Sequence, residues 1–420
     1  MDKMDSTRKS TKRLATAREL QQIVAEFYLE GHEAKKSGKP VGWMPPMNGL
    51  IEIFYAMDLQ PAFPENWSPV CAAFGLINKN YMTAASMGFS PDLCGYLRNC
   101  VGYINGMMGT EEVPLGGLPE PDMIFIPGAG CVPTMKNFQY IAKRFPDAKV
   151  FYADLPQVPI ENIQRYHIDY ALSEINRIIA FLTGATGRKL DYNRLAEVVI
   201  LSDQACALWD EITSYRCNIP TPISAAEVGL MFVMVTRQGT QLAVDYLTRV
   251  RDEVKQRAVQ GTGIIPEEKV RLFWDNIPLW YNLGLFNYFE RYGGVVVAET
   301  YSAAWSIRLD TSNPLEALAM KSLQSYPMVS CVSMRRRKEM VLKACRDYHI
   351  DGAILHSNKS CLPITLGQMD IKRALQQELG VPSVVIEADH MDPANFSLSQ
   401  FEDRAGSFME MLLQRKGFRQ

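Results

Sequence analysis

Short apolar runs that alternate with helical segments make up most of the chain. Residues 14–37 carry apolar positions at helical spacing, which predicts a surface helix that ends near Gly38. Four short β-like runs follow it, and helical patterns separate them. These runs are 41–44, 61–64, 122–128 and 149–156. Short apolar strands that alternate with helices are typical of a parallel α/β sheet.

The pattern changes in the middle of the chain and then returns. Three segments each predict long helical structure: 163–187, 191–212 and 224–259. Together they indicate a helical layer between two domains. Strand-like runs resume at 270–276, 294–300, 352–358 and 383–389. Residues 397–415 predict a closing helix, with Ser397 as its N-cap.

The two sets of strands resemble each other. The third run of each set ends on a cysteine, Cys131 in PDMIFIPGAGC and Cys361 in IDGAILHSNKSC. The fourth run of each set closes on an acid, Asp154 or Asp389. We therefore predict two similar α/β domains with parallel sheets of the Rossmann or flavodoxin type. Such sheets bind ligands beyond the carboxyl ends of their strands, so the two cysteines are candidates to face one another across an interdomain cleft.

Length and composition narrow the picture further. A chain of 420 residues is too long for one ordinary core. We expect a helical N-terminal segment (1–38), a first α/β domain (39–162), a helical layer (163–264) and a second α/β domain (265–420). The net charge of -2 gives no reason to expect a nucleic-acid or anionic membrane partner. With no secretory signal and no apolar run near the ~18–20 residues of a membrane span, the protein is expected to be cytoplasmic.

Nine cysteines bear on the chemistry. An odd count in such a chain argues against a disulfide framework, and no Cys-x-x-Cys or His-Glu-x-x-His motif indicates a local zinc site. Cys94, Cys131 and Cys361 have small residues or prolines nearby, and thiolates are soft ligands suited to iron–sulfur clusters. Spacing alone leaves open the alternative that all three are buried structural cysteines.

Several motifs in their order along the chain resemble the 2-hydroxyacyl-CoA dehydratase and benzoyl-CoA reductase superfamily, of the larger-subunit type. The resemblance runs from Gly42 to the C-terminal helix. The motifs are PAFPENW (61–67), SPDLCGYLR (90–98), PDMIFIPGAGC (121–131), RLFWDNIPLW (271–280), HSNKSCLP (356–363) and EADHMDPANFS (387–397). The resemblance implies a 4Fe-4S cluster bound by Cys94, Cys131 and Cys361, with its fourth iron position left for water, substrate or another ligand. It also implies a carboxylate near the cluster, here Glu65.

This resemblance implies an enzyme that removes water from a 2-hydroxyacyl-CoA thioester. The hydrogen to be lost is hardly acidic, so one electron is added to the thioester carbonyl, and the resulting ketyl radical expels the hydroxide. Glu65 is expected to act as a base or proton carrier, the alternative being a helix-capping acid. The resemblance also implies a homologous smaller subunit as partner. A separate ATP-hydrolysing iron–sulfur activator is expected to supply the electron, because the chain has no Walker A motif. No nucleic-acid or membrane partner is expected.

One departure keeps other functions open. Dehydratases of this family tend to carry a serine eighteen residues before the glutamate, and that position is Met47 here. The missing hydroxyl leaves room for an ATP-dependent aromatic acyl-CoA (benzoyl-CoA) reductase subunit, which consumes the electron. A subunit whose cluster only relays electrons is a third hypothesis.

Other residues are weaker candidates. Cys331 occupies the position of Cys94 in the second half and is a candidate fourth ligand, although a structural thiol is the favoured interpretation. No cysteine pattern supports a second cubane, and Cys71, Cys100, Cys206, Cys217 and Cys345 are expected to be structural. The run Arg335 to Lys338 would suit CoA phosphates but more often forms a solvated face. His356 is a candidate to support the last cysteine motif.

Overall fold

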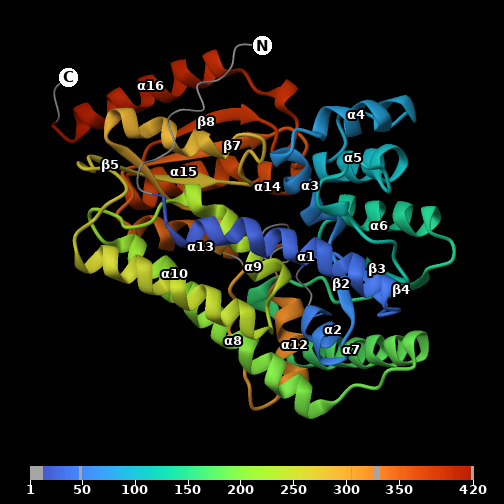
Figure 1. Cartoon of the computed structure of the whole chain (residues 1–420). Helices are drawn as coiled ribbons and strands as arrows, with labels where there is room; N and C mark the ends of the chain where they lie inside the picture. Colours follow the sequence, from blue (N-terminus) through green and yellow to red (C-terminus); the bar gives the residue numbers. More distant parts are fainter. Residues whose placement is uncertain (1–12, 47–49, 304, 326–331, 418–420) are drawn as a thin grey trace.

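The computed structural model describes residues 13–46, 50–303, 305–325 and 332–417. Two parallel four-stranded sheets organise them (Figure 1). The first sheet has the order β2-β1-β3-β4 and the second β6-β5-β7-β8. The strands are β1 (Val41–Trp43), β2 (Gln60–Ala62), β3 (Met123–Pro127), β4 (Lys149–Ala153), β5 (Val270–Asp275), β6 (Gly294–Glu299), β7 (Gly352–Asn358) and β8 (Ser383–Ala388). All eight predicted strands are confirmed, and so is the α/β class with two similar domains.

The helices account for most of the remaining described chain. In the first half they are α1 (Glu19–Lys36), α2 (Leu50–Ala56), α3 (Pro64–Ala73), α4 (Ile77–Ser86), α5 (Gly95–Gly102), α6 (Val132–Arg144), α7 (Arg165–Thr186) and α8 (Tyr192–Ser214). In the second half they are α9 (Met231–Thr236), α10 (Gln241–Val259), α11 (Thr300–Ala303), α12 (Pro314–Leu323), α13 (Met334–Asp347), α14 (Leu362–Thr365), α15 (Gln368–Leu379) and α16 (Leu398–Arg415). No helix in the described ranges is both long and apolar enough to cross a membrane.

Helices cover both faces of the first sheet. Phe54 of α2 packs edge-on against Phe125 of β3, so α2 lies on the face opposite to Trp43, whose ring meets Phe145 just after α6. Glycine is required at position 42 on β1, because a Cβ there would lie 2.4 Å from the Phe54 ring of α2. The burial of large aromatic side chains on both faces supplies much of the stability of this domain.

The second sheet is covered in the same way. Apolar residues of β5 and β7 that face one side pack with α13 and α15, and the other side packs against α16. The closing helix α16 begins where the sequence predicts, since the Ser397 hydroxyl accepts a hydrogen bond from the N–H of Gln400. The N-terminal helix is likewise confirmed as α1, and its buried stripe contacts the first sheet.

The middle helices connect the two halves, and one expectation about them was wrong. The predicted helical segment 224–259 is interrupted between α9 and α10. Gly239 has a φ of 84° there, and the Thr240 hydroxyl starts α10 by accepting from the N–H of Ala243. Arg237, the C-cap of α9, is buried there, and its guanidinium donates two hydrogen bonds to Glu30 on α1. Helix α8 packs on α2 and α10, and α7 packs on α12.

Candidate functional site

Each of the three candidate cysteines is the residue before the first turn of a helix. Cys131 follows β3 and is the N-cap of α6, and Cys361 follows β7 and is the N-cap of α14. Cys94 is the N-cap of α5. Each cysteine therefore stands where backbone N–H groups of a first helical turn point outward, an arrangement that favours a negatively charged sulfur.

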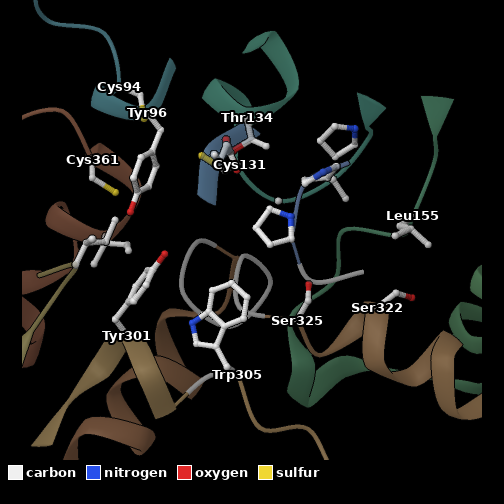
Figure 2. Close-up of a pocket in the computed structure, with 18 of the residues that line it drawn as sticks. Cys94, Tyr96, Cys131, Thr134, Leu155, Tyr301, Trp305, Ser322, Ser325 and Cys361 are labelled. Carbon is white, nitrogen blue, oxygen red and sulfur yellow. The ribbon is translucent and has the colours of Figure 1, made fainter. Parts of the chain in front are cut away.

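All three cysteines line one cavity of about 120 Å³, and Glu65 from the first turn of α3 lines it with them. Figure 2 shows the cysteines at one end of this cavity and Leu155 and Ser322 at the other. Strands β2 and β3 of the first domain and β7 of the second thus deliver side chains to one space. Parallel sheets bind ligands at these carboxyl ends, and here both sheets use the same cavity.

Burial controls the protonation of the thiols. It raises the pKa of Cys94 well above the ordinary value, and the nearby Cys131 and Cys361 raise it further. Burial also raises the pKa of Cys131, although the backbone N–H of Thr134 opposes the rise. The free thiols of Cys94 and Cys131 are therefore protonated at neutral pH. A cation that binds them must displace protons.

Glu65 is the one carboxyl group among the described cavity residues. Burial raises its pKa to about 7, and a hydrogen bond with the Thr134 side chain partly offsets the rise. A carboxyl group with this pKa gains and loses a proton near neutral pH, which suits a general acid or base.

Aromatic side chains form the wall beside the thiols. Tyr96 and Tyr301 both line the cavity, and their hydroxyl groups hydrogen-bond to each other (Figure 2). The indole N–H of Trp280 donates to the Tyr96 hydroxyl at 2.6 Å. The Tyr96 ring also packs edge-on against His390, with ring centroids 4.5 Å apart. Because these residues come from both domains, the wall closes the cavity across the domain boundary.

Within the described part of the chain, no group of three or more His, Cys, Asp or Glu side chains is placed to hold a metal ion, the three cavity cysteines included.

Two sequence candidates, Cys331 and Met47, lie outside the described residues. The basic run on α13 divides into two groups. Arg335 and Arg336 are exposed and Lys338 is partly exposed. All three form ion pairs with glutamates, as a solvated face does. Arg337, in contrast, is fully buried, so neither hypothesis for the run applies to it.

Arg337 lies 2.6 Å from the buried Asp275 carboxylate and also donates to the Ile364 carbonyl. It thereby ties α13 to the end of β5. His356 is buried too, and its Nδ1 lies 2.8 Å from the carbonyl oxygen of Ile277, a cavity residue. Burial lowers the His356 pKa to about 4, so its ring is neutral. His356 therefore holds the cavity wall in place through Ile277 and contributes no positive charge to the cavity.

Several cavity residues were not predicted from the sequence. Tyr96 and Tyr301 were not singled out, nor were Thr134 and His390. The signal for Tyr96, Thr134 and His390 was adjacency to a motif, because each lies one to three residues from Cys94, Cys131 or Asp389. Tyr301 had no such signal. Of the remaining described cysteines, Cys217 is exposed and the others are buried away from the cavity: Cys71, Cys100, Cys206 and Cys345.

Comparisons with known proteins agree with this architecture. The profile of the "2-hydroxyglutaryl-CoA dehydratase, D-component" family matches residues 49–412. The (R)-phenyllactyl-CoA dehydratase alpha subunit of Clostridium sporogenes is 29% identical over 98% of this chain and 99% of its own length. The (R)-2-hydroxyisocaproyl-CoA dehydratase alpha subunit of Clostridioides difficile is 27% identical, covering 94% and 95%.

One benzoyl-CoA reductase subunit, from Thauera aromatica, is nearly as similar, with 28% identity over 94% of both chains. The family match covers most of the chain and confirms the resemblance carried by the cysteine motifs. This chain therefore belongs to the 2-hydroxyglutaryl-CoA dehydratase D-component family.

Proposed function

We propose that this chain is the iron–sulfur subunit of a 2-hydroxyacyl-CoA dehydratase, with a 4Fe-4S cluster held by Cys94, Cys131 and Cys361. One observation carries the proposal: three thiols from two domains converge with Glu65 on a single cavity. The cavity also contains a carboxyl group poised to exchange protons at neutral pH.

The donor set fits such a cluster. Three thiolates suit iron, and each is the N-cap of a helix whose N–H groups favour the bound, charged form. All three thiols line the same cavity, so one cluster placed there would be within reach of each of them. Three protein ligands also leave one iron without a cysteine, which is the condition for an open site.

The residues around the thiols have separate tasks. The cluster supplies one-electron chemistry when bound. Glu65 accepts the proton from C3 of the acyl group, since its pKa of about 7 lets it act near neutrality. The Thr134 side chain orients the Glu65 carboxylate through their hydrogen bond. Tyr96 and Tyr301 exclude water from one side of the cavity.

The apolar lining of the cavity favours an uncharged acyl group. It includes Leu155, Ile277 and Trp305, and no lysine or arginine is present among the described lining residues. A second carboxylate on the substrate would be buried without a cation and near Glu65, which is costly. We therefore propose a 2-hydroxyacyl-CoA with an apolar side chain as substrate. A monocarboxylic acyl-CoA should be turned over at least about tenfold faster than 2-hydroxyglutaryl-CoA, since unpaired buried charge costs at least ~1.4 kcal/mol.

The relatives and the sequence support the proposed partners. Two of the most similar relatives are named as alpha subunits, so a second subunit is expected to complete the enzyme. The chain has no Walker A motif, so a separate ATP-hydrolysing activator would supply the electron.

The test is anaerobic reconstitution with iron and sulfide, followed by metal analysis and electron paramagnetic resonance. About four irons per chain are expected for the wild type, fewer for Cys131→Ser, and an unchanged number for Cys345→Ser, whose thiol is buried away from the cavity. Equal iron binding by both variants would refute the ligand assignment.

A benzoyl-CoA reductase subunit is the second candidate, favoured by the 28% identity to the Thauera aromatica protein. Electron accounting separates the two functions in the complete enzyme. A dehydratase returns the electron after each turnover, whereas a reductase consumes electrons with every product formed. Net consumption of reductant in proportion to product would exclude the dehydratase.

A further inference from the structure

A loop of the second domain packs against α5, the helix whose N-cap is Cys94. This loop comprises residues 389–392, directly after β8, and we call it the acidic loop. It lies against the first turn of α5, which belongs to the first domain. The contact is close at Gly95, where a Cβ would stand 2.7 Å from the Cβ of Met391. Glycine is therefore required at position 95 for the two domains to approach.

A hydrogen bond links the neighbours of two candidate cluster ligands. The N–H of Gly95, which follows Cys94, donates to the Oγ of Ser360, which precedes Cys361, at 3.1 Å. The Ser360 hydroxyl in turn hydrogen-bonds to the Asp389 carboxylate. This relay is buried and joins residues 265 positions apart in sequence. It is therefore a direct connection between the two cysteine motifs.

The Asp389 carboxylate is itself held in place. It accepts hydrogen bonds from the N–H groups of Met391 and Asp392, at 2.8 and 2.9 Å. Asp389 is 1% exposed, so these bonds order the acidic loop beneath the protein surface. Its side chain has its partners within the loop and at Ser360.

An ion pair reinforces the same contact one turn along α5. Arg98 lies 3.0 Å from the Asp392 carboxylate, and both side chains are less than a tenth exposed. The same guanidinium nitrogen donates to the Pro91 carbonyl, and the guanidinium carbon lies 3.7 Å above the centre of the Tyr81 ring. Arg98 thus connects the acidic loop to the segment on both sides of Cys94.

We propose that Ser360, Asp389, Asp392 and Arg98 form an interdomain clamp that sets the spacing of Cys94 and Cys361. These are positioning residues, since they touch the neighbours of the cysteines and not the cavity thiols. The purpose of the clamp rests on the proposed cluster, whereas its geometry does not. Cys131 has no part in it, because its place relative to Cys94 is set within the first domain.

Thiol crosslinking of the cluster-free chain tests the clamp. Bismaleimidoethane is applied to a Cys217→Ser background, which removes the exposed thiol, and crosslinked peptides are quantified by mass spectrometry. The readout is the ratio of Cys94–Cys361 to Cys94–Cys131 crosslinks. The second crosslink is an internal control for folding and reagent access, because both of its cysteines lie in the first domain.

Ser360→Ala is the principal variant, since it removes one hydroxyl group and leaves the packing intact. It should lower the ratio about fivefold, as expected for the loss of one hydrogen bond. Asp392→Asn, which breaks a buried ion pair, should lower it more than about tenfold. Asp351→Asn is the matched control, because it removes an acid of the second domain at the opposite edge of the sheet. Its ratio should equal that of the wild type.

Two outcomes would overturn the clamp. One is an unchanged ratio in Ser360→Ala and Asp392→Asn. The other is a wild type that forms the Cys94–Cys131 crosslink but no Cys94–Cys361 crosslink. Iron release to a chelator from reconstituted protein gives a second readout, and Ser360→Ala should release iron about fivefold faster. A wild-type chain that shows the crosslink ratio but binds no iron would leave the clamp standing and refute the proposed function.

Discussion

The acidic side chains of the two α/β domains make the same contacts at the amino-terminal edges of the two sheets and different contacts at the carboxyl edges. At the amino-terminal edge, Asp122 precedes β3 and accepts a hydrogen bond from the N–H of Val41 on β1, at 2.8 Å. In the second domain, Asp351 precedes β7 and accepts from the N–H of Arg271 on β5, also at 2.8 Å. A lysine pairs with each acid. The repeated structure thus extends to single side chains.

The reactive side chains of the first domain lie in the cavity wall. Glu65, Cys94 and Cys131 all line it, and the acid that closes β4, Asp154, is exposed and bound by the Tyr170 hydroxyl. No described residue of the cavity wall pairs Glu65 with a positive charge, so its proton can move.

The second domain instead satisfies its strand-end acids internally. Asp275 pairs with Arg337, Glu299 accepts from the N–H of Ser302, and Asp389 is held by the acidic loop and Ser360. Cys361 is the strand-end cysteine that this domain contributes to the cavity. A repeated backbone therefore does not carry the same chemistry in both domains. The chemistry of a strand-end side chain depends on whether it contacts a bonding partner or lines the cavity.

The largest effect should come from replacing Glu65, the acid of the first domain that lines the cavity without a cationic partner among the described residues. Glu65→Gln is expected to lower turnover by about 10²–10⁴-fold, because a base that accepts the substrate proton is lost. Its counterpart, Glu299→Gln, should weaken folding by about 1–3 kcal/mol and leave turnover of the folded protein near normal. Turnover by the complete complex and thermal denaturation measure the two effects. The comparison fails if Glu299→Gln abolishes turnover without loss of stability.

Buried and exposed ion pairs should differ next. Arg337→Met leaves the Asp275 carboxylate buried and unpaired, so it should lower the free energy of unfolding by about 3–5 kcal/mol. Lys35→Met breaks the ion pair with Asp122. Because these two side chains are 38% and 41% exposed, the free energy of unfolding should fall by at most about 1 kcal/mol. Denaturant titration of both variants checks this order. Equal losses would contradict the view that the second domain is the more internally bonded one.

The pH dependence of turnover should reveal Glu65. As a base it must be ionised, so turnover is expected to fall as the pH decreases through about 7. Thr134→Val removes a hydrogen bond that lowers this pKa, so the acid limb should move to higher pH. Asp389 cannot supply this limb, because its pKa lies below the ordinary value. A pH–rate profile of both proteins is the measurement, and a limb that does not move in Thr134→Val would argue against Glu65.

The smallest effect belongs to the exposed acid of the first domain. Asp154→Asn changes a solvated side chain and should alter the free energy of unfolding by no more than about 0.5 kcal/mol. Asp389→Asn, at the equivalent strand end, should be clearly destabilising because its carboxylate is buried among hydrogen-bond donors. Thermal denaturation of the two variants side by side would expose any hidden role of Asp154.

The sequence alone determined the frame of this protein. Eight short apolar runs became eight strands, and Cys131 and Cys361 came to lie just beyond two of them. Such features are local: alternation and run length specify a strand, and the residue after a strand lies at the sheet edge. The cap at Ser397 is local in the same sense.

Only the tertiary structure decided which side chains meet. Arg237, at the break before α10, is buried against Glu30, 207 residues away. The burial of Arg337 depends on Asp275, and the clamp depends on Gly95 meeting Ser360. A charged or polar residue is exposed or buried according to whether a distant partner satisfies it. No pattern along the chain records that partner, because the contact is created only when the two domains close.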